Sequence, residues 1–102
     1  MIQRHALLTE GYYYILISLY KPRHGYGIMQ VTQKISGGRV RLTAGTLYGA
    51  IKILLKREWI QLYDTKGRKI EYIITPLGKQ IIKNEINRLK ELYDIGLIIQ
   101  EE

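Results

Sequence analysis

The side chains of this chain that could carry chemistry are cations and tyrosines, not nucleophiles or metal ligands. The sequence has no cysteine and two histidines, His5 and His24, which lie in separate segments. A catalytic nucleophile needs an adjacent base, and a metal site needs clustered His, Cys or acidic ligands. The sequence shows neither pattern. We therefore expect a protein that is not an enzyme and that needs no metal and no cofactor.

The positive charge is concentrated in the body of the chain. Residues 1–83 carry 14 Lys and Arg against 4 Asp and Glu, whereas residues 84–102 carry 2 against 5. A cationic body suits a polyanion, because neutralising phosphates releases condensed counterions and drives association. This charge pattern favours a nucleic-acid partner, although a membrane surface would also attract it.

Residues 41–60, RLTAGTLYGAIKILLKREWI, combine a helix start, an apolar stripe and a cationic face. The Thr43 hydroxyl can accept from the backbone N–H of Thr46 and so begin a helix. One side of that helix is apolar and holds Leu47, Ile51, Leu54 and Leu55 at spacings of three and four. The other side holds Gly45, Tyr48, Gly49, Lys52 and Lys56. This pattern predicts the recognition helix of a DNA-binding domain.

Two glycines within that polar face need an explanation. Glycine costs about 1 kcal/mol relative to alanine inside a helix. Gly45 and Gly49 lie four residues apart, on the same side as Tyr48 and Lys52. Either they allow close approach of the helix backbone to DNA, or they allow helix packing, and the sequence leaves both alternatives open.

Three other helices and a hairpin must position this stretch. The first helix is expected from Thr9 to about Tyr20, where Pro22 stops it, and the second over residues 28–35, between HGYG and SGG. HGYG lacks the third glycine of a dinucleotide-binding loop, so we interpret it as a turn. β-Favouring residues 59–63 and 70–75 flank a polar, basic turn and predict a hairpin.

The last helix is expected to begin at Thr75 and Pro76 and to run to about Ile99. Its apolar stripe covers over five turns, which is longer than one small core requires, so we predict a homodimer. The alternative is a monomer whose last helix lies across its own domain. The expected dimer residues are Tyr12, Tyr13, Leu16, Ile82, Ile86, Leu89 and Tyr93.

These elements predict a mainly α fold with a small β-hairpin (α+β). Residues 1–75 would form a winged helix-turn-helix domain and residues 76–102 a dimerisation helix, all within one compact domain. Basic residues before the recognition helix and at the hairpin tip extend its cationic face. These residues are Arg39, Arg41, Lys66, Arg68 and Lys69.

The segments TEGYYYILISLY, HGYGI, TAGTLYGAIKILLKREWI and RKIEYIITPLG together resemble the PadR family of transcriptional regulators, over nearly the whole chain from Leu8 to about Leu97. The resemblance implies a dimeric winged-helix repressor of a pseudo-palindromic operator in double-stranded DNA. The DNA-contacting positions it implies are Thr43, Gly45, Thr46, Tyr48 and Lys52, with Lys66, Arg68 and Lys69 in the wing. In short members a single carboxy-terminal helix makes the dimer.

The resemblance also implies a flat aromatic effector between the first and last helices, for which the candidates here are Tyr12, Tyr13, Tyr14 and Tyr93. Two positions depart from the family pattern. Ala44 stands where proline is frequent and should preserve the helix start. Glu58 stands where glycine is frequent, before the first wing strand, and could change the turn into that strand.

Two other functions remain compatible with the sequence. One is a winged-helix interaction module without specific DNA readout, and the other is a multidrug-sensing variant. The amino terminus lacks the apolar run of a signal peptide, and no apolar run approaches the roughly 18 residues of a membrane span. We therefore expect a cytoplasmic protein that is not bound to a membrane.

Overall fold

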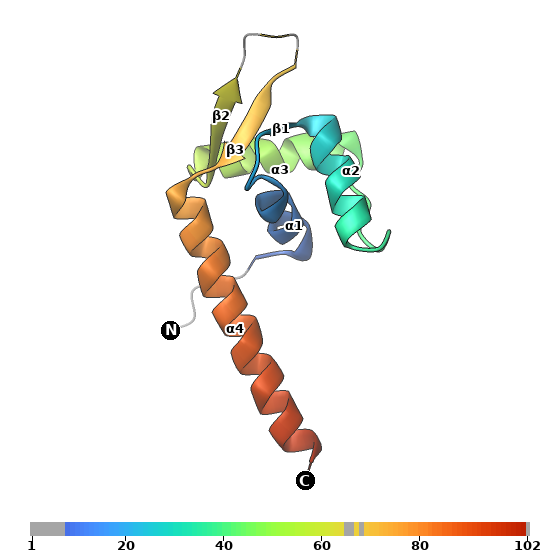
Figure 1. Cartoon of the computed structure of the whole chain (residues 1–102), viewed down its shortest axis with the longest axis vertical. Helices are drawn as coiled ribbons and strands as arrows, with labels where there is room; N and C mark the ends of the chain where they lie inside the picture. The colour runs from blue at the N-terminus through green and yellow to red at the C-terminus, as the bar shows by residue number, and fades with distance from the viewer. Residues whose placement is uncertain (1–7, 65–66, 68, 102) are drawn as a thin grey trace.

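A computed structural model of the chain describes residues 8–64, 67 and 69–101 (Figure 1). Lys66 and Arg68, two of the predicted wing contacts, lie outside the described residues. The elements, in chain order, are α1 (Glu10–Ser18), β1 (Arg23–His24), α2 (Gly25–Ile35), α3 (Ala44–Lys56), β2 (Ile60–Asp64), β3 (Glu71–Ile74) and α4 (Pro76–Gln100). The predicted winged helix-turn-helix fold with a long last helix is confirmed.

Three threonines begin three of the helices. The side-chain oxygens of Thr9, Thr43 and Thr75 accept from backbone N–H groups three residues ahead, at 3.1, 3.2 and 3.0 Å. Each hydroxyl satisfies a donor that the first helical turn leaves unpaired. These helix starts are those predicted from the sequence.

The second helix begins three residues earlier than predicted, at Gly25. His24 occupies the N-cap position without a side-chain hydrogen bond to the helix. Two glycines in the first turn, Gly25 and Gly27, disfavour helix on propensity alone. Packing in the folded chain therefore decides this helix start.

Two helices end in the same hydrogen-bonded turn. After α2, Gly37 has a φ of +65°, and the N–H groups of Gly37 and Gly38 donate to the carbonyls of Lys34 and Gln33. After α3, Glu58 has a φ of +62°, and the N–H groups of Glu58 and Trp59 donate to Leu55 and Leu54. Both ends are Schellman motifs, in which glycine is the favoured left-handed residue.

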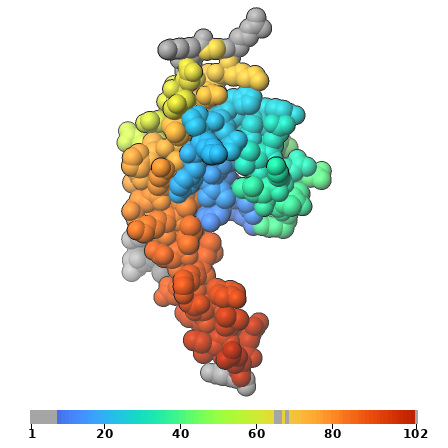
Figure 2. Space-filling view, in the orientation of Figure 1, coloured from blue at the N-terminus to red at the C-terminus, as the bar shows by residue number. Residues whose placement is uncertain are grey.

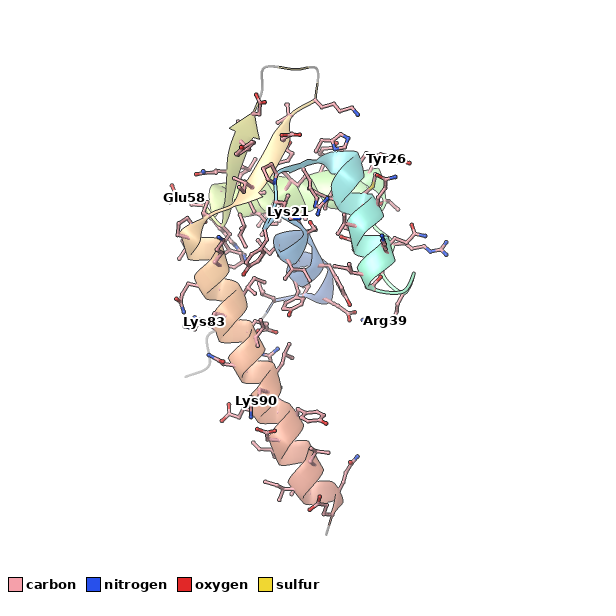
Figure 3. The ribbon with its side chains drawn as sticks, in the orientation of Figure 1. Lys21, Tyr26, Arg39, Glu58, Lys83 and Lys90 are labelled. Atoms are coloured by element: carbon pink, nitrogen blue, oxygen red, sulfur yellow. The ribbon has the colours of Figure 1, made fainter. Side chains whose placement is uncertain are left out.

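Glu58 therefore keeps the turn in the geometry that glycine favours. A left-handed conformation costs a residue with a Cβ roughly 1–2 kcal/mol. The surroundings hold it in place: the Glu58 carbonyl accepts from the Thr75 hydroxyl at 2.7 Å, and Trp59 is buried in the core. In Figure 3, Glu58 lies where α3, the wing and α4 meet.

We expect Glu58→Gly to stabilise the protein by about 0.5–1 kcal/mol, because relief of the left-handed strain exceeds the greater unfolded-state entropy of glycine. Urea unfolding followed by circular dichroism measures the change. Glu58→Ala, which keeps the Cβ, should alter stability by less than about 0.5 kcal/mol. A Glu58→Gly variant less stable than Glu58→Ala would contradict the strain argument.

The wing is part of a three-stranded antiparallel sheet with strand order β1-β3-β2. The predicted hairpin is β2 and β3, which pair Ile60 with Ile74 and have an irregularity between Leu62 and Asp64. The additional strand, β1, pairs Arg23 with Tyr72 and His24 with Glu71. Its two residues tie the start of α2 to the wing.

The core lies where α1, α2, α3, the sheet and the first turns of α4 meet. It contains Ile15, Leu16, Leu19, Ile28, Leu47, Ala50, Ile51, Leu54, Trp59, Ile60, Tyr72, Ile74 and Ile82. Leu16 and Ile82 were predicted at the dimer surface, but they are 0% and 2% exposed. That assignment is wrong for both residues, because each fills the core of its own chain.

The carboxy-terminal half of α4 extends away from the body of the molecule (Figures 1 and 2). Large apolar side chains on this half, including Leu92, Tyr93, Ile95, Ile98 and Ile99, are more than half exposed. Within residues 8–64 and 69–101, no helix combines the length and the hydrophobicity of a membrane span.

Candidate nucleic-acid interface

One face of α3 joins the core and the opposite face is exposed. Leu47, Ile51 and Leu54 are buried as predicted, and Leu55 is half-buried. The exposed residues are Ala44, Gly45, Thr46, Tyr48, Gly49, Lys52, Ile53 and Lys56. The polar side of the predicted recognition helix is therefore accessible to a ligand.

Gly45 and Gly49 are not required for packing within the described part of the chain. A Cβ built on either residue meets no atom within 4 Å. Of the two alternatives left open by the sequence, packing inside this chain is thereby excluded. Close approach by another molecule remains as a reason for two glycines in the middle of a helix.

Thr43 and Thr46 share one hydrogen-bonding arrangement at the start of α3. The Thr43 oxygen accepts from the Thr46 N–H, and its hydroxyl donates to Thr46 Oγ1 at 3.0 Å. Thr43 is thus occupied in capping the helix. Thr46 keeps a hydroxyl hydrogen that an incoming phosphate or base edge can accept.

Tyr48 packs against α2 as well as facing solvent. Its residue is 50% exposed, yet a Cβ built on Gly25 would overlap the Tyr48 hydroxyl oxygen and lie 2.7 Å from its Cζ. The ring therefore lies directly against the backbone at the start of α2. Tyr48, predicted only as a DNA contact, also fixes the orientation of α3 relative to α2.

A hollow of about 320 Å³ lies between the start of α2, the middle of α3 and the wing. Lys69 reaches across it, with its Nζ 3.2 Å from His24 Nε2. Burial raises the pKa of Tyr72, and the neighbouring Tyr48 raises it further. The hollow is lined by His24, Gly25, Tyr26, Tyr48, Lys69, Ile70 and Tyr72.

His24 and Tyr26 are site residues that the sequence analysis missed. The HGYG motif was the signal, but it indicated only a turn. Tyr26 is exposed and lies at the end of α2 nearest the wing (Figure 3). The structure brings these two side chains together with Tyr48 and Lys69. Both of those residues lie more than twenty positions further along the chain.

Arg39 is not a free cation on this surface. Its Nη1 donates to Glu10 Oε1 at 2.9 Å, and its Nη2 pairs with the other carboxylate oxygen of Glu10. The hydrogen bonds from Arg39 lower the pKa of Glu10. In Figure 3, Arg39 lies near the end of α2 that is farther from the wing. The prediction of Arg39 as a phosphate contact is therefore not supported, whereas Arg41 is exposed.

A second cleft, of about 260 Å³, lies between α1 and α4. Of the four tyrosines predicted as ligand contacts, Tyr13 and Tyr14 line this cleft, whereas Tyr12 and Tyr93 do not. Glu85, which is 5% exposed, accepts from Arg88 Nε at 3.0 Å on the same wall. Burial raises the pKa of Tyr13, and the Glu85 carboxylate raises it further.

Within the described ranges, no group of His, Cys, Asp and Glu side chains is arranged to hold a metal ion. The structure instead offers an exposed helix face bordered by a hydrogen-bonding hollow. A helix-turn-helix whose third helix is exposed beside a β-hairpin is the winged-helix fold of DNA-binding proteins. The fold and the site therefore define a winged-helix protein.

The chain belongs to the Transcriptional regulator PadR-like family, whose sequence profile matches residues 14–84. The predicted family is thereby confirmed. Its members are transcriptional regulators, which also confirms that the chain is not an enzyme. All of α3 and all the residues that line the hollow lie within the matched range.

One curated protein is also similar to part of the chain. The chain is 32% identical over 71 residues to an uncharacterised 37.1 kDa protein in transposon TN4556 of Streptomyces fradiae, and the match covers 70% of this chain and 20% of that protein. The chain thus spans about a fifth of the length of this curated relative.

Two solved structures show the same fold. A PadR family transcriptional regulator from Eggerthella lenta has a TM-score of 0.71 at 19% identity, over 89% of this chain and 82% of that one. Bordetella bronchiseptica BpsR, whose DNA binding is regulated by 6-hydroxynicotinic acid, has a TM-score of 0.70 at 16% identity, over 91% and 67%.

We expect Gly45→Ala and Gly49→Ala each to stabilise the protein by up to about 1 kcal/mol and to weaken DNA binding, because the added methyl group improves helix propensity and blocks close approach. Thermal unfolding and fluorescence anisotropy with a labelled duplex measure the two effects. Gly11→Ala in α1 is the matched control, since its Cβ would make only an ordinary 3.8 Å contact with Leu42. It should leave DNA affinity unchanged. Unchanged affinity in both α3 variants would exclude close approach.

Proposed function

We propose that this protein is a sequence-specific DNA-binding repressor that acts as a homodimer on a pseudo-palindromic operator. The observation that carries the proposal is the exposed face of α3, where two glycines without an internal packing role lie beside Thr46 and Lys52. A helix face of this kind can enter the major groove, while Lys69 and the other basic wing residues contact phosphates. Acting on DNA, the protein would function in the cytoplasm.

The positive charge of the body supports the same proposal. Lys52 and Lys56 are exposed on α3, Lys69 is exposed at the wing, and Arg41 is exposed before the helix. Each cation that neutralises a phosphate contributes to affinity through counterion release, independently of base sequence. Sequence preference would then come from Thr46, whose hydroxyl can reach base edges, and from contacts of the exposed part of the Tyr48 ring.

Selection of bound fragments from random duplexes at near-physiological salt tests the proposal. We expect an inverted repeat whose half-site centres are one helical turn, about 10–10.5 bp, or a multiple of it apart. Lys52→Ala and Lys69→Ala should each reduce the slope of log affinity against log salt by about 0.9. Lys90→Ala, on the exposed side of α4 and paired with Asp94, is the control and should leave the slope unchanged.

An interaction module without specific DNA readout predicts a different outcome. No repeat would then be enriched, and affinity for DNA would be the same for every sequence. Transcription from a template carrying the selected repeat tests the sign of regulation. A repressor lowers the transcript yield when the repeat overlaps the promoter.

The homodimer is supported by the apolar side of α4. Ile86, Leu89 and Tyr93 are 48%, 43% and 66% exposed, and they continue the line of the buried Ile82 along the helix. The carboxy-terminal part of α4 extends away from the rest of the described chain, as the space-filling view in Figure 2 shows. A second α4 would cover this side and remove apolar area from water.

Light scattering should give twice the 11.9 kDa mass of one chain. We expect Leu89→Asp to shift the protein to the monomer, because it places a charge in the proposed interface. Asn87→Asp introduces the same charge at an exposed position on another side of α4 and should remain dimeric. A concentration-independent monomer for the unchanged protein would contradict the proposal.

An aromatic effector is a further part of the proposed function. The cleft between α1 and α4 has aromatic walls from Tyr13 and Tyr14 and a charged wall from Glu85 and Arg88. BpsR, whose fold is similar, has its DNA binding regulated by an aromatic acid. Release of operator DNA on addition of an aromatic compound tests the proposed effector site. Release by a phenolic acid would indicate an aromatic-acid sensor, and release by a planar aromatic cation would indicate a multidrug sensor.

A further inference from the structure

The two glycines of HGYG make room for two side chains that line one hollow. A Cβ on Gly25 would overlap the Tyr48 hydroxyl, and a Cβ on Gly27 would lie 3.0 Å from His24 Nδ1. At both Gly25 and Gly27, the absence of a Cβ leaves space for a neighbouring side chain. It keeps Tyr48 and the His24 imidazole close to the start of α2, where they face the wing.

The contact between His24 and Lys69 brings an imidazole nitrogen next to an ammonium group. Lys69 Nζ lies 3.2 Å from His24 Nε2. A lysine ammonium group only donates hydrogen bonds, so a hydrogen bond between the two groups requires Nε2 to be the acceptor. A doubly protonated His24 would present an N–H to the ammonium, and the two cations would repel each other.

We propose that His24 and Lys69 form a phosphate clamp in which DNA binding takes up a proton at His24. A phosphodiester oxygen placed between the two groups can accept from both when His24 Nε2 carries a hydrogen, and the doubly protonated imidazole makes the stronger, charge-assisted bond. The anion then replaces a direct contact between the groups with two charge-assisted hydrogen bonds. This inference rests on the DNA-binding function proposed above.

The surroundings of the clamp suit a singly charged anion. Tyr26 and Tyr48 provide hydroxyl donors from α2 and α3 at the same hollow. The His24 and Tyr26 rings are in edge-to-face contact, with their centroids 6.5 Å apart. The hollow, of about 320 Å³, is wide enough to admit a phosphate group.

Other titratable and charged residues of β1 and β3 lie near His24. Glu71 is the register partner of His24 in β3 and brings an acidic residue to the neighbouring strand. Tyr72 is the neutral neighbour of Glu71. Arg23, in the same strand as His24, directs its Nε to the Ser18 carbonyl at 2.7 Å and so is held toward α1. The principal opposing charge is therefore Lys69.

The clamp predicts a specific pH dependence. Histidine is the side chain whose charge ordinarily changes between pH 5 and 8. A phosphate stabilises the charged form, so its contribution to affinity is present at low pH and is lost as the pH rises. Because at most one proton is taken up per clamp, the DNA affinity can change by at most tenfold per pH unit. We expect DNA affinity about three- to tenfold higher at pH 6 than at pH 8.

Fluorescence anisotropy of the full chain with a selected duplex, at constant ionic strength from pH 5.5 to 8.5, tests the clamp. His24→Gln cannot be protonated and should bind with a flat pH profile and with reduced affinity at pH 6. His5→Gln removes the other histidine and should keep the profile of the unchanged protein. Circular dichroism of each variant verifies its fold.

A second measurement does not depend on any variant. Calorimetric titration of the unchanged protein with DNA at pH 7, in two buffers of different ionisation enthalpy, counts the protons taken up. We expect a fraction of one proton per clamp. No uptake, or a pH profile that His24→Gln leaves unchanged, overturns the clamp while DNA binding stands. Failure to bind any duplex at any pH overturns the proposed function and the clamp together.

Discussion

The arrangement of this molecule depends on the junction where α3 ends, β2 begins and α4 starts. Thr75 makes three connections there: its N–H donates to the Trp59 carbonyl at 2.9 Å, its hydroxyl donates to the Glu58 carbonyl at 2.7 Å, and its oxygen caps α4. Gly78 then lies so close that an added Cβ would be 2.7 Å from Ile74 Cγ1 and 3.1 Å from the Trp59 carbonyl carbon. One hydroxyl and one missing side chain thus fix the recognition helix, the wing and the last helix relative to one another.

Local signals in the sequence were sufficient to predict most of the elements. Thr9, Thr43 and Thr75 are polar residues directly before apolar helical patterns, and capping acts over only three residues. The start of α2 and the strand β1 could not be predicted in this way. Arg23 and His24 form a strand because Tyr72 and Glu71 lie beside them in the fold, and pairing over that sequence distance leaves no local pattern.

The site was predictable in its outline but not in its pairings. The spacing along α3 predicted which side is exposed, because helical periodicity alone determines it. It did not predict that Glu10, 29 residues earlier, neutralises Arg39, or that Gly25 accommodates Tyr48. Nor can an apolar stripe separate core from interface: Leu16 and Ile82 belong to the first, while Ile86 and Leu89 are exposed. These distinctions come from tertiary contacts.

The continuity of α4 has a mechanical consequence. Its 25 residues form one helix, about 38 Å long at 1.5 Å per residue, from the junction beside α3 to the exposed apolar end. In a dimer joined through that end, each α4 would act as a rigid lever, with the wing and α3 attached at its amino-terminal end. The α1–α4 cleft lies along this lever, so a small rotation there would be converted into a larger change in the distance between the two recognition helices. Binding of a molecule in the cleft and fit to the operator would then be linked through rigid-body geometry, without unfolding of either site.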